Sequence, residues 1–332
     1  MPVVHFLNVG DGDCSIIQHG SGRTTVVDIC NGESATHKAL LEEAFNEYAI
    51  GIAKTGSGNY GMRKHVTLPI SYMKRIGISK VFRFILTHPD MDHMDGFKKF
   101  CNEIGFLNFW DSGVRRAKPD FSGGIYNEGD WDHYVKVRDG KCGGVKVVTP
   151  KAVSSLQYAN LGDPDDQGDC LDIVAPDSEL VLAANDVGDP NDASYVLVFR
   201  TIGGKIIFPG DAHDNTWKYV LNNHSNLVEN CAVLIAPHHG RHSARSFDFL
   251  DVLKPKLTLF GCANSKHLAY ADWNNRSLAH ITNNQAGNIL LNGINEGIEV
   301  YVENFNYAQN CRCFDNTKTL YGCFYIGLVS KE

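Results

Sequence analysis

The sequence lacks most of the features that mark membrane, secreted or polyanion-binding proteins. It contains no run of about 18 apolar residues, which a transmembrane helix would need. The first residues, MPVVHFLNVGDGD, have neither the basic start nor the apolar stretch of a signal peptide. We therefore expect a cytoplasmic protein with no membrane insertion. The net charge of -7 also excludes an overall positive field that would hold a polyanion.

Paired cysteines and composition breaks are missing as well. The ten cysteines include no Cys-x-x-Cys pair, and most lie in apolar, strand-like text such as ENCAVLIAP (229–237). This distribution favours buried, reduced thiols. No low-complexity tract, charge block or proline-rich linker divides the chain.

The apolar pattern predicts a mixed α/β fold. CSIIQHGSGRTTVVDIC reads as a hairpin closed by Asp28, and SYVLVFRTIGGKIIFPGDA repeats this order and closes on Asp211, which suggests two related halves meeting near 150–190. Further strands are expected at 81–86, 232–237, 257–261 and 297–305, and helices at 35–52, 67–77, 93–105, 215–224 and 246–253. Residues 112–192 are rich in glycine, aspartate and proline and give no clear assignment.

Ionisable residues are concentrated in LTHPDMDHMDG (86–96), directly after a predicted buried strand. The residues with metal-ligand chemistry in this turn are His88, Asp90, Asp92 and His93. Pro89 bars His88 from helical geometry, so a tight loop can make these side chains converge. Their charges would be buried unpaired unless a cation neutralised them, and a divalent metal is the simplest one. The alternative is a solvated helix N-terminus capped by aspartates.

Two more clusters of ligand-type residues follow predicted strands. Asp211 comes after KIIFPG, and the pair His238 and His239 comes after AVLIAP. Each of them alone fits a surface or capping residue. Three such clusters at strand ends of one α/β chain favour a metal centre.

These motifs resemble the metallo-β-lactamase fold, and within it the soluble hydrolase domain of the ComEC/Rec2 competence proteins. The resemblance runs in order through FLNVGDGDCSII, VVDIC, ILTHPDMDHMDG, NDASYVLVF, FPGDAH, LIAPHHGRHSARS and NNQAGNILL. It implies an αββα sandwich with two mixed sheets flanked by helices and metals at one rim. We expect one hydrolase domain over residues 1–291 and a C-terminal β extension over 292–332 that packs on the same domain.

The resemblance also implies a site for two divalent metal ions. The implied ligands are His88, Asp90, Asp92, His93, Asp211 and His239. His88 and Asp90 would hold one ion. Asp92, His93 and His239 would hold the other, and Asp211 would bridge the two ions. His239 is preferred to His238 because the family pattern is Pro-x-His-Gly. Asp28 would brace the loop from beneath as an acceptor behind the ligands.

Two positions depart from the commoner form of that fold. Asp90 stands where the commoner form has a histidine, and the histidine expected between the turn and Asp211 is missing. Asn191, Ser194 or a water molecule could fill the missing position. Because a carboxylate in place of imidazole hardens the site, we expect zinc or manganese.

Hydrolysis is the chemistry that such a site implies. Two metals about 3.5 to 4 Å apart lower the pKa of a bridging water to about 7, which makes a metal-bound hydroxide available. The residues expected to take part in catalysis are Asp92, His213, His238 and His267. His213 or His238 would protonate the leaving group, and His267 would contact phosphate or transfer a proton. Helix capping is the alternative for His213 and His267.

Positive side chains near the site favour a phosphoester substrate. The residues expected to bind it are Arg241, His242, Ser243 and Arg245. Guanidinium groups match phosphate oxygens bidentately, although a basic surface turn is also ordinary. Further positive residues are Lys54, Arg63, Lys64, His65, Arg115, Arg116 and Lys118. If these line the same rim, a strand of nucleic acid could follow them.

Three functions remain open at this point. The first is a metal-dependent phosphodiester hydrolase acting on nucleic acid, a freestanding defence or DNA-processing nuclease that works with a partner protein. The second is a hydrolase of a small ester, such as a cyclic nucleotide, a phosphocholine-type ester, a lactone or a thioester, because the same metals serve all of these. The third is a metal-poor binding subunit of a larger complex. The C-terminal strands could build the edge of an oligomer.

Overall fold

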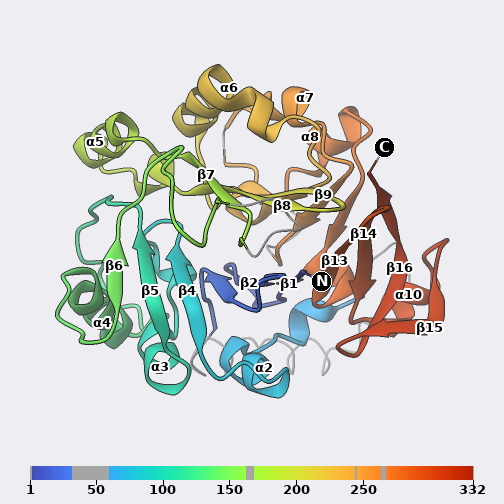
Figure 1. The fold of residues 1–332 in the computed structure, drawn as a ribbon, viewed down its shortest axis with the longest axis horizontal. Coiled ribbons are helices and arrows are strands. Elements are labelled where there is room, and N and C mark those ends of the chain that lie inside the picture. Colours follow the sequence, from blue (N-terminus) through green and yellow to red (C-terminus); the bar gives the residue numbers. More distant parts are fainter. Residues whose placement is uncertain (1, 32–59, 162–167, 244, 263–266, 332) are drawn as a thin grey trace.

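Two β-sheets pack face to face in the computed structural model, which describes residues 2–31, 60–161, 168–243, 245–262 and 267–331 (Figure 1). Among these residues the larger sheet has ten strands, in the order β15 (Asp315–Leu320), β16 (Cys323–Ser330), β14 (Gly297–Val302), β13 (Ile289–Ile294), β1 (Val3–Phe6), β2 (Ser15–Gln18), β3 (Thr24–Val27), β4 (Val81–Leu86), β5 (Phe106–Asp111) and β6 (Lys146–Val148). The smaller sheet has six, in the order β12 (His280–Thr282), β11 (Leu257–Phe260), β10 (Val233–Ile235), β9 (Gly204–Phe208), β8 (Val196–Thr201) and β7 (Leu171–Ala175).

Both sheets are mixed. Strands β3 to β6 run parallel, whereas β1, β2 and β13 to β16 join the same sheet by antiparallel pairs. In the smaller sheet β9 to β12 run parallel, and β7 and β8 pair antiparallel. The two predicted hairpins are found as β2–β3 and β8–β9, one in each sheet.

Helices lie on the outer faces of the sheets (Figure 1). Those that pack on the ten-stranded sheet are α2 (Pro69–Arg75), α3 (Phe97–Glu103) and α4 (Glu128–Arg138). Those that pack on the six-stranded sheet are α6 (Asp214–Val228), α7 (Phe249–Leu253) and α8 (Tyr270–Asn275). The other helices are α5 (Ser178–Val187), α9 (Asn283–Ala286), α10 (Phe305–Gln309), η1 (Met62–Lys64), η2 (Met91–His93), η3 (Pro190–Ala193) and η4 (Pro237–Gly240). The predicted αββα class is confirmed.

Alternating apolar residues explain the layers. On β4, Ile85 points between the sheets and packs in one cluster with Leu197 and Ile206, whereas Phe84 points outward against Phe97. Full burial of such side chains contributes about 1.5–3 kcal/mol each. On β4, side chains on one face therefore pack against the other sheet, and side chains on the other face pack against a helix.

Predicted and observed elements agree where the apolar period is strong. The expected helix at 35–52 lies outside the described residues. The unassigned region 112–192 contains α4, β6, β7 and α5. None of the ten cysteines forms a disulfide in the structure. In the described part of the chain, no helix combines the length and the apolar character needed to cross a membrane.

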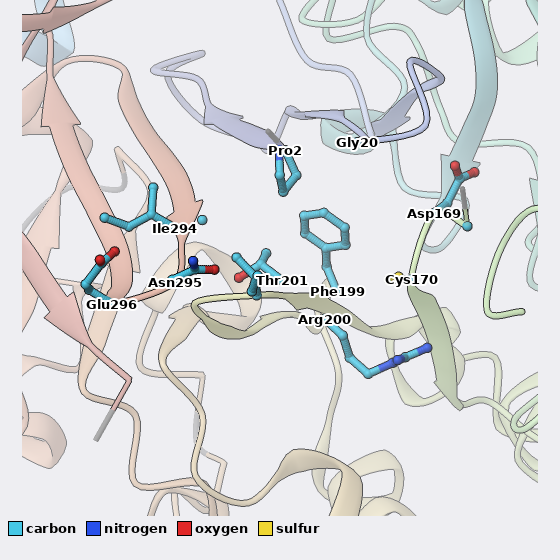
Figure 2. A pocket seen from close by; sticks show the side chains of 13 residues that line it. Pro2, Gly20, Asp169, Cys170, Phe199, Arg200, Thr201, Ile294, Asn295 and Glu296 are labelled. Atoms are coloured by element: carbon cyan, nitrogen blue, oxygen red, sulfur yellow. The ribbon is translucent and has the colours of Figure 1, made fainter. Parts of the chain in front are cut away.

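A pocket of about 460 Å³ opens at one end of the sandwich, where β8 turns into β9 (Figure 2). Pro2, Phe199, Thr201 and Ile294 line it, and Asp169 lies at its edge. Asp211 follows the opposite end of β9, so this pocket is separate from the predicted metal ligands.

Asp169 holds a buried ion pair beside this pocket. Its carboxylate accepts from Arg83 Nη2 at 2.9 Å and from Arg23 Nε at 2.8 Å. The Arg83 side chain is 2% exposed and stacks on Trp110. A charge this deep depends on its partner, since breaking a buried pair leaves the other ion desolvated and unpaired.

We predict that Asp169→Ala lowers the free energy of unfolding by about 3–5 kcal/mol. Urea unfolding measures this loss. The matched control is Asp172→Ala, which breaks the Arg200–Asp172 pair whose side chains are 30% and 20% exposed. Since such pairs contribute about 0–1 kcal/mol, the control should lose far less. Equal losses in the two variants would contradict the prediction.

Candidate metal centre

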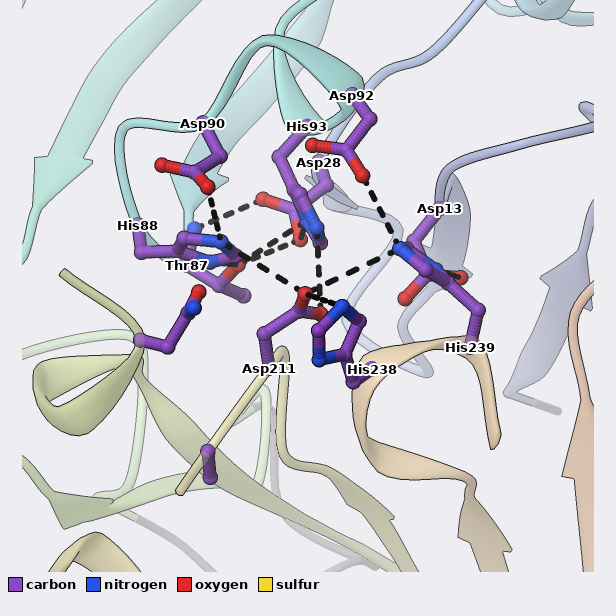
Figure 3. A network of polar contacts seen from close by, with 12 residues as sticks. Asp13, Asp28, Thr87, His88, Asp90, Asp92, His93, Asp211, His238 and His239 are labelled. Atoms are coloured by element: carbon purple, nitrogen blue, oxygen red, sulfur yellow. Dashed lines mark hydrogen bonds and ion pairs between the residues drawn. The ribbon is translucent and has the colours of Figure 1, made fainter. Parts of the chain in front are cut away.

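The predicted ligands meet at one rim of the sandwich because they follow neighbouring strands. His88 comes after β4 of the larger sheet, and Asp211 comes after β9 of the smaller sheet. Strands β9 and β10 are parallel, so the turn after β10 brings His238 and His239 beside Asp211. The His238 backbone N–H donates to the Gly210 carbonyl at 3.1 Å. Figure 3 shows these side chains pointing toward one another.

Two glycines permit the close approach of the segments. Gly210 has a φ of 52°, and a Cβ there would lie 2.7 Å from the Cβ of Thr87, which belongs to the other sheet's rim. Gly12 has a φ of 152°, and a Cβ there would lie 2.4 Å from the Asp92 carbonyl oxygen. Only glycine therefore lets the loops before Asp211 and Asp13 reach the centre.

The Asp211 carboxylate is the common neighbour of four imidazoles. Its Oδ1 lies 3.2 Å from His93 Nε2. Its Oδ2 lies 3.6 Å from His238 Nε2 and 3.9 Å from both His88 Nε2 and His239 Nε2. His88, His93, Asp211 and His239 are all buried. The structure thus brings the predicted residues of three strand ends into one buried cluster.

Asp28 lies where the sequence expects it, beneath the 88–93 loop. Its Oδ1 accepts the Thr87 backbone N–H at 2.8 Å, and its Oδ2 accepts the Thr87 hydroxyl at 2.7 Å. His93 Nδ1 lies 2.8 Å from the same Oδ2. Since β3 and β4 are parallel with Val27 opposite Ile85, Asp28 is held in register with Thr87. The contact fixes the orientation of the His93 ring.

Asp13 is a residue that the sequence analysis missed. Its Oδ1 lies 3.1 Å from His239 Nδ1, and Asp13 is buried. His239 Nε2 then faces Asp92 Oδ2 at 3.3 Å. Asp13 therefore lies beside His239 Nδ1 as Asp28 lies beside His93 Nδ1, but the contact of Asp13 is an ion pair without hydrogen-bond geometry. Asp13 belongs to the segment FLNVGDGDCSII, so its place in that motif is the sequence signal that could have identified it.

The donor set fits divalent metal ions. Buried side-chain atoms that have no hydrogen-bond partner among the described residues include His88 Nε2, His93 Nε2 and Asp211 Oδ1. Because His93 Nδ1 is engaged by Asp28, its Nε2 and Asp211 Oδ1 place two acceptor atoms 3.2 Å apart, an arrangement that requires a cation. Ligand-type atoms of His88, His93 and Asp211, and of Asp92, His93 and His239, lie within 4.8 Å of one another.

The pKa shifts within the cluster also favour a bound cation. Burial disfavours the charged form of His93, but the Asp211 and Asp28 carboxylates outweigh it and raise its pKa well above the usual value. Burial also opposes the charge on His239, where Asp13 and Asp211 raise the pKa to about 10. Burial would raise the pKa of Asp211, yet His93 and His239 hold it well below its usual range. These shifts favour a positive charge at the positions that a metal would take.

Among the remaining predicted residues, the Asp90 side chain is 22% exposed, whereas Ser194 is buried. Asp90 Oδ2 lies 3.9 Å from His88 Nε2, and the Asp90 carboxylate also pairs with Arg116. Asn191 Oδ1 and Ser194 Oγ are buried and have no hydrogen-bond partner in the described part of the chain. Their role at the missing histidine position stays a prediction.

The predicted proton donors differ in their surroundings. His213 is the N-cap residue of α6, but its side chain makes no capping bond; its Nδ1 lies 2.8 Å from Asp189 Oδ2. The His213 and His238 rings stack with centroids 6.2 Å apart. Burial lowers the pKa of His238 to about 4. His267 is exposed, and its carbonyl accepts the His242 backbone N–H at 2.6 Å.

The predicted substrate-binding residues divide into two pairs. Ser243 Oγ lies 3.3 Å from His238 Nδ1, and Arg245 contacts the same nitrogen and donates to the Asp211 carbonyl at 3.1 Å. Arg241 instead pairs with Asp11 at 3.6 Å, and the exposed His242 packs on Phe247. Ser243 and Arg245 are therefore the two that reach the cluster.

Comparison with known proteins finds similarity at the level of solved structures. No protein-family model and no curated protein sequence matches the chain. The similar structures include Igni18, a metallo hydrolase from the archaeon Ignicoccus hospitalis, at 12% identity over 88% of this chain and 100% of that one, with a TM-score of 0.49. They also include the metallo-β-lactamase fold protein YhfI from Bacillus subtilis, at 8% identity over 85% and 96%, with a TM-score of 0.44. A diphosphatase from the PhnP family shares 12% identity over 85% and 94%, with a TM-score of 0.39.

We predict that Asp13→Ala weakens metal binding by about 10- to 100-fold, because it removes the acceptor that orients His239. Titration with Zn²⁺ or Mn²⁺ measures the affinity. Asp11→Ala is the matched control, since Asp11 lies on the same loop but pairs with Arg63 and Arg241. An unchanged affinity in Asp13→Ala would remove Asp13 from the site.

Metal binding should also release protons. The neighbouring carboxylates raise the pKa of both His93 and His239, so we expect both rings to be cations at pH 7 before a metal binds. A metal can bind each Nε2 only after its proton leaves, so about two protons should be released and affinity should rise with pH. Calorimetric titration in buffers of different ionisation enthalpy counts them. Release close to zero would mean either that these nitrogens are not ligands or that they carry no proton before the metal binds.

Proposed function

We propose that this protein is a metal-dependent hydrolase of the metallo-β-lactamase superfamily that cleaves phosphodiesters with nuclease-like chemistry. The observation that carries the proposal is the convergence of four imidazole rings and further carboxylates on Asp211 at one rim of the sandwich. His88 and Asp90 would hold one divalent ion, zinc or manganese, and Asp92, His93 and His239 a second, with Asp211 shared. Bound there, such ions lower the pKa of a coordinated water and accept charge on a phosphoryl oxygen.

Arg245 supports a phosphoester over an uncharged ester. Its partly buried guanidinium donates to the carbonyls of Asp211 and Ala212, each at 3.1 Å. A guanidinium fixed beside the ligands places a permanent positive charge where an anionic substrate would bind. Proton delivery to the leaving group is assigned to the histidines around this position, among which His213 is held by Asp189.

A specific observation favours a second candidate, the hydrolysis of a small ester. A pocket of about 300 Å³ adjoins Asp90 and Asp92, with Phe121, Tyr126 and Arg116 in its wall. A pocket of this size suits a small molecule. Four of the positive residues predicted to guide nucleic acid are meanwhile paired with carboxylates: Arg63 with Asp11, Arg115 with Asp111, Arg116 with Asp90, and Lys118 with Glu128 and Asp132. Lys54 lies outside the described residues.

We expect the protein loaded with Mn²⁺ or Zn²⁺ to hydrolyse bis(p-nitrophenyl) phosphate. The double variant Asp92→Ala, His93→Ala should fall to the background rate, because it removes two ligands of one ion. Parallel assays on single-stranded and double-stranded DNA distinguish the two substrate classes, since a nuclease nicks polymers and a small-ester hydrolase does not. Equal cleavage by wild type and the double variant would mean that a contaminant causes it. No hydrolysis by fully metal-loaded protein would overturn the proposal.

A further inference from the structure

The four histidines around Asp211 differ in what holds their second ring nitrogen. A neutral imidazole carries one proton, so the partner of Nδ1 decides what Nε2 presents to the centre. If Nδ1 donates to an acceptor, Nε2 presents a lone pair and can bind a metal. If Nδ1 accepts from a donor, Nε2 presents N–H and cannot.

Two of the histidines have carboxylates at Nδ1. His93 Nδ1 lies 2.8 Å from Asp28 Oδ2, and His239 Nδ1 lies 3.1 Å from Asp13 Oδ1. A carboxylate only accepts, so the hydrogen bond to Asp28 keeps the proton on Nδ1 of His93. The Asp13 carboxylate favours the same state of His239, although this 3.1 Å contact lacks hydrogen-bond geometry. Loss of the second proton then leaves the lone pair at Nε2, on the side of Asp211. Both rings are thus arranged as metal ligands.

His88 reaches the same state through a hydroxyl. Its Nδ1 lies 3.1 Å from Thr87 Oγ1. The Thr87 hydroxyl has one proton, which it donates to Asp28 Oδ2 at 2.7 Å. Oγ1 must therefore accept from His88 Nδ1–H, and the buried Nε2 of His88 presents its lone pair to the centre.

His238 has the opposite arrangement. Its Nδ1 contacts Arg245 Nη2, and Ser243 Oγ lies 3.3 Å away. A guanidinium has donors and no acceptor, so His238 Nδ1 must accept and its proton must sit on Nε2. That Nε2 lies 3.6 Å from Asp211 Oδ2.

The backbone separates the two neighbouring rings. His238 and His239 have φ angles of 53° and 58°, and their ring planes are 81° apart. Non-glycine residues adopt this left-handed conformation at an energetic cost that functional sites tolerate. His239 is buried, whereas the His238 side chain is 21% exposed, so His238 faces the side from which a substrate can enter.

We propose that His238 is a hydrogen-bond donor to substrate and not a metal ligand, and that Arg245 is the positioning residue that fixes its Nε2–H tautomer. The Nε2–H would bind the substrate oxygen on which negative charge develops, as preorganised donors do in other hydrolytic sites. This role rests on the proposed function, because it needs a substrate at Asp211. The doubled histidine then supplies one ligand and one donor.

The tautomers can be read directly by NMR. Long-range ¹H–¹⁵N correlation of the full-length protein with ¹⁵N-labelled histidine shows which ring nitrogen carries the proton, and His238→Gln assigns the His238 signals. We expect the proton on Nε2 of His238, before and after loading with Zn²⁺. Arg245→Met should abolish this preference, whereas Arg241→Met, the matched control on the same turn, should retain it. A proton on Nδ1 of His238 in the wild type would overturn the assignment.

Metal content and kinetics test the role of the ring. His238→Ala should keep the zinc equivalents of the wild type, whereas His239→Ala should lose one. With bis(p-nitrophenyl) phosphate, His238→Ala should reduce kcat by about 100- to 1000-fold. His238→Gln, which restores an N–H donor, should recover part of that loss. Loss of a zinc equivalent in a folded His238→Ala protein would instead make His238 a ligand.

These measurements separate the two proposals. If the wild type hydrolyses no phosphoester, the proposed function fails, and the tautomer and the zinc content still decide whether His238 is a ligand. If the wild type is active and His238→Ala is equally active, the donor role fails and the proposed function stands.

Discussion

The need to neutralise one buried carboxylate organises this rim of the molecule. Asp211 is 3% exposed, and four imidazole nitrogens lie within 3.2 to 3.9 Å of its oxygens. Burial alone would favour the protonated acid, but the charged histidines around it hold its pKa well below the usual range. The raised pKa values of His93 and His239 favour protons as the source of that positive charge before a metal binds. A divalent ion bound to the same ring nitrogens would supply the positive charge without these protons, so the metal and the protons compete for the same nitrogens.

This cluster exists only because two sheets meet there. Asp28 and His88 come from strand ends of the larger sheet, whereas Asp211 and His238 come from strand ends of the smaller one. The approach of Gly210 to Thr87 closes the distance between them. Asp28, His238 and His239 all have positive φ angles, and such conformations persist only where the surrounding packing fixes them. The pairing of β3 with β4 and of β9 with β10 provides that packing.

The local sequence predicts the strands of this arrangement and the polar residues that follow them. The strands before Asp28, His88 and Asp211 are short apolar runs that end in turn residues, so both the strands and the polar residues after them could be foreseen. The contact of Asp13 with His239 joins positions 226 residues apart (239 − 13), and no periodicity in either segment encodes it. The choice between His238 and His239 likewise depends on what each Nδ1 touches, which requires coordinates. Helices α4 and α5 escaped assignment because glycine, aspartate and proline surround them.

The charge distribution limits how a substrate can be recognised. The net charge of -7 repels polyanions, and the arginines and lysines near the rim are largely paired with carboxylates. Since exposed charges are screened beyond about 8 Å at physiological ionic strength, paired residues exert little attraction at a distance. Recognition must therefore come from contacts at the centre itself. Under the proposed function, Arg245 and His238 would offer donors to a phosphoryl group there, and the pocket beside Asp90 would offer aromatic walls to a group attached to it.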